Sequence, residues 1–138
     1  MSGGSYNYLY QELRLAANVA EWDGRCLSAE GQQLRKMCVD IARSPTWCAD
    51  ITPDIAVHSA AFLALPLLSA KYVTKEHEDL AQAWEWACSG DRSYRAYADT
   101  AAKVLTGPPL NDDLSMHAWM EAEYEAAVAY KKAMENKP

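Results

Sequence analysis

The longest apolar stretch of the chain covers residues 51–73 and contains very few charged side chains. A helix that is apolar on nearly every side has no stable position at a water surface, so other elements must cover it. We therefore expect a central helix over residues 53–72. The segment Thr52–Asp54 is a strong start signal, with a hydroxyl cap, a proline at the first helical position and an acid in the first turn. Pro66 predicts a kink near residues 63–65, or a split of this helix into two.

Apolar residues at spacings of three and four predict further helices on both sides of this central element. The expected helices cover residues 6–21, 28–43, 75–88, 91–105 (beginning at Asp91 or Ser93) and 111–136. Gly90 is expected to end the third of these in the left-handed conformation. The last helix has no internal glycine or proline, and its apolar stripe consists of Met116, Met120, Tyr124, Ala127, Val128 and Met134.

These elements define the predicted fold class. Alanine is abundant and β-branched residues are sparse, so propensity favours helix wherever the pattern is ambiguous. A chain of 138 residues can bury one substantial core. The sequence predicts an all-α protein: a compact helical domain of five to seven helices around the central helix, a single domain over residues 1–138, with a long C-terminal helix.

Charge and composition narrow the class of partner. Asp and Glu outnumber Lys and Arg by 19 to 13, for a net charge of -6 and a pI near 5.0, which disfavours direct contact with a phosphate backbone. The four cysteines include no C-x-x-C pair, and the opening residues lack the pattern of a signal peptide. No run is long and clean enough to cross a bilayer. We expect a cytoplasmic protein with reduced thiols and no membrane contact.

The aromatic residues point toward protein binding. Five Trp and eight Tyr stand against one Phe, so nearly every aromatic ring carries a polar group, as is typical of interface anchors. Single aromatics more often line a half-buried helix face, but the set is larger than one helical core needs. Together with acidic residues at helix starts, the candidate partner-binding residues are Tyr6, Tyr8, Tyr10, Trp47, Glu76, Glu78, Asp79, Trp86, Asp112, Asp113, Trp119 and Tyr130.

Candidate catalytic chemistry is weaker. His58 is better explained as a satisfied core histidine than as a ligand or general base, and His77 as part of a solvated acidic cap. One face of the last helix carries ionisable residues every four positions, which is half of a metal site, but no second helix offers a matching E-x-x-H. These residues are Asp113, His117, Glu121 and Glu125. No nucleophile elbow, phosphate loop or H-E-x-x-H motif occurs. The sequence predicts neither an enzyme nor a bound cofactor or metal.

Two segments resemble a known group of sequences. The opening SGGSYNYLY (residues 2–10) and the segment AWEWACSGDRSYRAYADTAAKVL (residues 83–105) resemble small phage and prophage proteins that begin SGGS-aromatic and carry an E-W-x-x-SGD turn between two helices. The matching positions are Ser2, Gly3, Gly4, Ser5, Tyr6, Tyr8, Glu85, Trp86, Ser89, Gly90 and Asp91. The resemblance covers about a quarter of the chain; it implies a mobile-element origin and a shared pair of helices, but no activity.

We therefore hypothesise a small acidic protein, monomeric or dimeric, that binds a protein partner. The most concrete version is an anti-CRISPR-type inhibitor, acting in the host cytosol on a nucleic-acid-binding defence complex and blocking its basic surfaces. One alternative is a structural or scaffolding phage protein that self-associates through its last helix. A second alternative is a metal-dependent enzyme using His58 or the face that carries His117 and Glu121.

Overall fold

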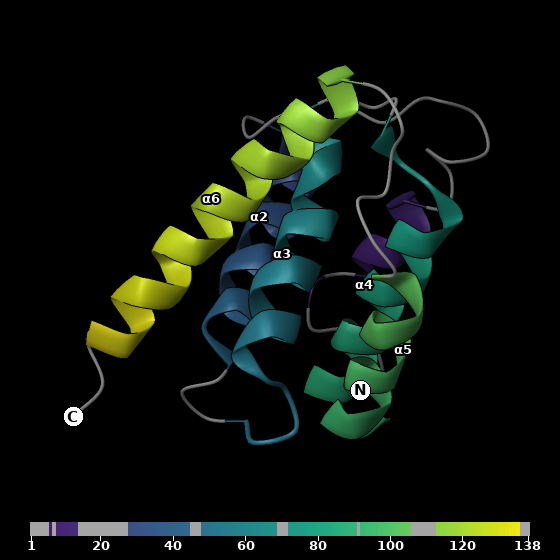
Figure 1. Cartoon of the computed structure of the whole chain (residues 1–138). Helices are drawn as coiled ribbons and strands as arrows, with labels where there is room; N and C mark the ends of the chain where they lie inside the picture. Colours follow the sequence, from purple (N-terminus) through teal and green to yellow (C-terminus); the bar gives the residue numbers. More distant parts are fainter. Residues whose placement is uncertain are drawn as a thin grey trace.

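The computed structural model of the protein describes residues 6, 8–13, 28–44, 48–68, 72–90, 92–105 and 113–135. Within these ranges all regular secondary structure is helical, which confirms the all-α prediction (Figure 1). Residues 9–13 form a short helical stretch, and the longer helices are α2 (Ala29–Ala42), α3 (Pro53–Leu68), α4 (Lys75–Cys88), α5 (Tyr94–Val104) and α6 (Asp113–Glu135).

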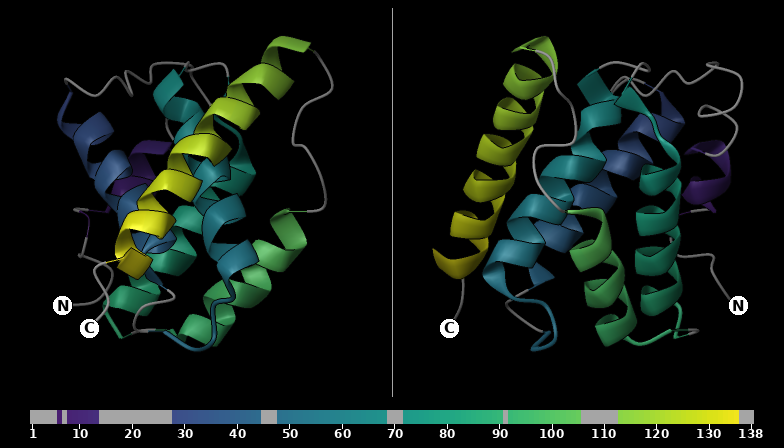
Figure 2. Two further views of the ribbon diagram at one scale, coloured as in Figure 1. Left: turned by 60° about the vertical axis from the view of Figure 1, so that its left-hand side comes forward. Right: turned by 45° about the vertical axis from the view of Figure 1, so that its right-hand side comes forward.

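The predicted central helix is α3, which contacts α2, α4, α5 and α6. α4 and α5 form an antiparallel pair on one side of it, and α6 lies on the other side at the edge of the bundle (Figures 1 and 2). Half of the residues of α3 are buried and most of the others are partly buried, in keeping with its apolar sequence. The first turns of α2, α4 and α6 all lie at the upper end of the bundle in both figures.

Local capping chemistry explains why several helices begin and end where the sequence predicts. The Ser28 hydroxyl accepts a hydrogen bond from the Gly31 N–H at 3.0 Å, and Ser93 does the same for Ala96 at 3.0 Å. Gly90 follows α4 with a φ of 85°, the left-handed conformation that favours glycine. Ser93, rather than Asp91, therefore provides the cap of α5.

Pro66 does not break α3 at residues 63–65, because the helix continues through it to Leu68. The proline nitrogen cannot donate to the carbonyl of Phe62 one turn earlier. That carbonyl is instead paired with the Nε2 atom of His77 at 2.9 Å. The helix therefore tolerates the proline in its last turn, where α4 supplies the missing donor.

His77 is buried, which corrects the expectation of a solvated cap. Its side chain is 1% exposed, and its ring stacks on Phe62 with centroids 3.9 Å apart. The backbone N–H of Thr74 donates to Nδ1 at 3.1 Å, so Nδ1 is the acceptor and Nε2 carries the proton. Burial lowers the pKa of His77 from 6.5 to about 3, so the ring is neutral at physiological pH.

The first predicted helix is described only in part. Residues 9–13 are helical, and Leu9 and Leu13 are buried as their spacing predicts. Residues 14–27 lie outside the described part of the chain. This short stretch packs beside α4, where its first residues meet a buried carboxylate.

Candidate functional site

The long helix α6 packs on the core through small side chains. Every residue of α6 that is described as buried is an alanine: Ala118, Ala122, Ala126 and Ala133. The larger residues of the predicted apolar stripe lie along one side of α6, but that side faces solvent. Only Met116 among them is partly buried. The sequence pattern alone favoured the larger side chains for the core, and the structure places alanine there instead.

The exposed apolar residues of the protein gather around α6. Among the described residues, the exposed large apolar side chains are Leu68 (47% exposed), Met120 (60%), Tyr124 (72%), Val128 (39%) and Met134 (40%). Four of these five lie on α6, and Leu68 ends the neighbouring helix α3. Contiguous apolar surface of this kind marks an interaction site more often than chance. We call Met120, Tyr124 and Val128, one turn apart, the α6 face.

A groove lies next to the α6 face, between α2 and α6, with α3 as its floor. Its volume is about 500 Å³; small apolar side chains such as Ala60 and Ala64 form its floor, and Ala126 of α6 lines its wall. Alanine at this helix crossing leaves the space unfilled, because no larger side chain reaches across it. A second hollow of about 470 Å³ adjoins it and continues the groove past Leu68 and Met120.

The charges of this groove are arranged unevenly along α6. Glu121 and Glu125 line its first half, where Arg35 of α2 also lies. Lys132 lines the second half, together with Arg43 just after α2. Glu121 additionally lies 3.8 Å from His117 on its own helix, both well exposed. The flank of α6 that faces α2 is therefore acidic in its first half and basic in its second.

His58 connects α6 to the central helix. Its Nδ1 atom lies 2.6 Å from the Glu123 carboxylate, and its ring stacks against Trp119 with centroids 5.9 Å apart. His58 is thus partnered, but its side chain is 42% exposed, so it is not the core histidine that the sequence analysis predicted. Trp119 is half-buried at the same contact, so part of its ring remains accessible.

A second polar cluster lies at the opposite side of the core and was not predicted. Glu85, in the middle of α4, is fully buried, and its Oε2 atom accepts hydrogen bonds from the backbone N–H groups of Tyr6 and Tyr8 at 2.8 and 2.9 Å. Tyr8 has a φ of 58°, a conformation that costs a non-glycine residue about 1–2 kcal/mol. Burial raises the pKa of Glu85, while the backbone donors oppose that rise.

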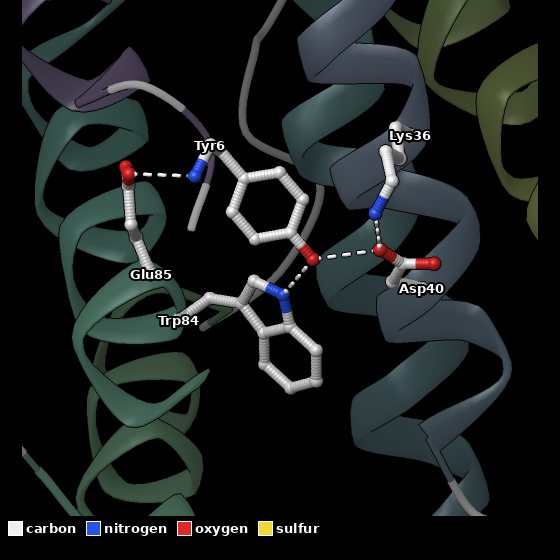
Figure 3. Close-up of polar contacts among 5 residues, drawn as sticks. All are labelled: Tyr6, Lys36, Asp40, Trp84 and Glu85. Carbon is white, nitrogen blue, oxygen red and sulfur yellow. Dashed lines mark hydrogen bonds and ion pairs between the residues drawn. The ribbon is translucent and has the colours of Figure 1, made fainter. Parts of the chain in front are cut away.

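Tyr6 extends this cluster across the core to α2 (Figure 3). Its hydroxyl donates to Asp40 at 2.7 Å and accepts from the Trp84 indole N–H at 3.0 Å. Lys36 then pairs with Asp40 at 2.9 Å. Tyr6 and Glu85, one in each of the two segments named in the sequence comparison above, are therefore joined by a hydrogen bond. The sequence signal that could have revealed this cluster was the shared pattern, because Glu85 is the glutamate of E-W-x-x-SGD and Tyr6 is the aromatic residue after SGGS.

The structure divides the predicted partner-binding residues into two groups. Tyr6, Tyr10 and Glu78 are buried, so they belong to the interior and not to the accessible surface. Glu76 and Asp113 are exposed, and Asp79 is partly exposed and paired with Lys75. Tyr8, Trp86, Trp119 and Tyr130 are half-buried, and Trp47 and Asp112 lie outside the described residues.

Trp86 has its own partners. Its ring packs edge-on against Tyr10, with centroids 6.3 Å apart, and the Arg92 guanidinium lies 4.7 Å from the ring centroid. These contacts account for its half-burial without an external partner. For the exposed and half-buried residues, partner binding stays a prediction.

The ionisable residues do not converge on an ion site in the part of the chain that the structure describes. No group of three or more His, Cys, Asp or Glu side chains in those ranges could hold a metal. Cys38, Cys48 and Cys88 are free thiols, and burial raises the pKa of Cys38 and of Cys88. The described helices also include none with the length and apolarity of a bilayer span.

Comparison of the chain with family models, curated proteins and solved structures gives no match.

Proposed function

We propose that this protein acts by binding other proteins, and that its target is a host defence complex, which it inhibits in the manner of an anti-CRISPR protein. The observation that carries the binding part is the concentration of exposed apolar side chains around α6. The acidic composition and the phage-type sequence pattern support the choice of target. The proposed action is occlusion of a basic surface that normally holds nucleic acid.

The upper end of the bundle is the surface best suited to that occlusion. The first turns of α2, α4 and α6 lie at this end, those of α2 and α6 on opposite sides of it, and carry the exposed acidic residues Glu30, Glu76 and Asp113 (Figures 1 and 2). Acidic residues favour helix starts for local reasons, because they complement the helix dipole. Three such starts at one end add their fields, and the resulting negative surface is complementary to a groove that binds phosphates.

Co-purification tests this proposal. The tagged full chain is mixed with purified nucleic-acid-binding defence complexes at low and at physiological salt, and complex formation and nucleic-acid binding are both measured. We expect binding that weakens with salt, loss of nucleic-acid binding by the target, and loss of both effects in the double variant Glu76→Lys, Asp113→Lys.

Asp99→Lys is the matched control for charge reversal. Asp99 is exposed on α5, which begins at the lower end of the bundle, so this variant should inhibit like the parent. Equal loss in both variants would mean that net charge alone drives binding. Failure of the parent chain to bind any defence complex at either salt would reject the inhibitor proposal.

A further inference from the structure

The geometry of α6 points to a second copy of this chain as the occupant of the α6 face, docked antiparallel to form a two-fold symmetric dimer. This inference rests on the proposed function only in treating the α6 face as a protein-binding surface. The helix is long enough for such a contact, because its 23 residues span about 34 Å. In the right-hand view of Figure 2 α6 lies at the edge of the bundle, and in the left-hand view it lies in front of the other helices, so a second helix can approach its outer side.

The apolar centre of the α6 face is diametrically opposite its buried stripe. Successive residues of a helix are rotated by about 100°, so the direction midway between Tyr124 and Val128 is opposite that of Ala126. Ala126 is 8% exposed and packs in the core. A helix laid against Tyr124 and Val128 would therefore bury apolar surface on the one side of α6 that the monomer leaves uncovered.

Symmetry then decides which charges meet. In an antiparallel pair, the two-fold axis is perpendicular to the plane of the two helices. The groove flank of one α6 therefore lies beside the groove flank of the second α6, and the two helices run in opposite directions. Glu121 and Lys132, both on the groove flank, are equidistant from the midpoint between Ala126 and Ala127. Glu121 of one copy therefore lies level with Lys132 of the second copy, and each dimer contains this pair twice.

The same register brings other groups together. Tyr124 comes level with Ala129 of the second copy, next to Val128, and His117 lies one residue, about 1.5 Å along the axis, from the level of Glu135. Arg43, at the basic end of the groove, adds positive charge near the incoming Glu121. A parallel two-fold pairing would instead set this flank against the opposite flank of the second copy, so Glu121 and Lys132 would stay about 16 Å apart along the axis and would not pair. The charge pattern of this flank is thus self-complementary only in the antiparallel arrangement.

The dimer has a consequence for the proposed function. Reversal of one copy relative to the other places the two acidic upper ends, with Glu76 and Asp113, at opposite ends of the assembly. The dimer would present two separate negative surfaces to basic partners. If the α6 face instead bound a different protein, the chain would be a monomer whenever that protein was absent.

Charge-swap variants measured by sedimentation equilibrium test this inference. The parent chain should dimerise, and Glu121→Lys and Lys132→Glu, at exposed positions, should each weaken the dimer by about tenfold to a hundredfold, since each replaces two attractive pairs by two repulsive ones. An equimolar mixture of the two single variants should regain a heterodimer, and the double variant should regain the homodimer.

Controls separate this result from misfolding and from the proposed function. Circular dichroism should show unchanged helicity in every variant, and Tyr124→Glu should abolish the dimer by placing a charge at its centre. Glu76→Lys should leave the dimer constant unchanged while it weakens defence-complex binding. A parent chain that stays monomeric at all concentrations, or a mixture of single variants that fails to associate, would overturn the antiparallel dimer.

Discussion

The helices α4 and α6 are both amphipathic, yet they use their faces in opposite ways. α4 places large side chains in the core, including Trp84 at 0% exposed, and takes the polar residues His77 and Glu85 into the interior with hydrogen-bond partners. α6 contributes alanines to the core and exposes Tyr124 and its apolar neighbours. A buried large apolar side chain contributes about 1.5–3 kcal/mol, against about 0.8 for a methyl-sized group, so each buried large apolar residue of α4, such as Trp84, contributes more to the fold than each buried alanine of α6.

This difference separates stability from recognition. The side chains of α4 are committed to contacts inside the chain, as Trp84 shows by its contacts with Tyr6, Tyr94 and Tyr97. The exposed large side chains of α6, such as Met120 and Tyr124, contribute little to the fold and remain available to a partner. Substitutions in the two helices should accordingly affect different measurements.

The largest expected effect is that of Trp84→Ala. Removal of this ring leaves a cavity beside Tyr97 and removes the indole donor to the Tyr6 hydroxyl. We expect the free energy of unfolding to fall by about 3–5 kcal/mol, as measured by urea denaturation followed by circular dichroism.

Tyr124→Ala is the matched control for that substitution, since it also removes an aromatic ring. Because Tyr124 is 72% exposed, its replacement by alanine should change the unfolding free energy of the dilute protein by no more than about 0.5 kcal/mol. Similar losses from the two variants would show that α6 is as much a part of the core as α4, against this comparison.

A pH-dependent effect is expected from His77. Its pKa is 6.5 when unfolded and about 3 in the fold, so below pH 6.5 the unfolded chain binds a proton that the folded chain does not. Stability should therefore be unaffected above about pH 7 and should fall by about 1.4 kcal/mol per pH unit as the pH drops from 6.5 toward 3.

The variant His77→Asn isolates this contribution, because asparagine is polar but does not titrate. Its unfolding free energy is expected to be lower than that of the parent at pH 7 and to depend less on pH between 6 and 4. If the two proteins lose stability in parallel over that interval, the acid sensitivity comes from other groups.

The smallest effect is expected at the contact that holds α6 to α3. His58→Ala removes the interaction with Glu123 and the stack on Trp119, and because both side chains of the ion pair are partly exposed the loss should be about 1 kcal/mol or less. Hydrogen exchange should accelerate mainly in α6 amides and little in α4. Uniform acceleration in both helices would indicate that α6 does not open independently.

Prediction from sequence succeeded where the decisive interactions are local. The limits of α4, the serine caps of α2 and α5, and the left-handed Gly90 depend on side chains within a few residues of each helix end. The long apolar run likewise required a central buried helix, whatever covers it. For the candidate site, the last helix and its apolar stripe were found, but not the direction in which the stripe faces.

Sequence by itself determined that this chain is helical, acidic and built around one apolar helix, because these properties follow from composition and short-range periodicity. Only the tertiary structure decided that alanine, and not methionine or tyrosine, packs α6 on the core, and that Glu85 and His77 are buried. Each of those outcomes depends on a group far away in the chain: Glu85 on the amides of Tyr6 and Tyr8, and His77 on the carbonyl that Pro66 leaves without a donor. Such pairings have no periodicity, so they become visible only when the helices are placed side by side.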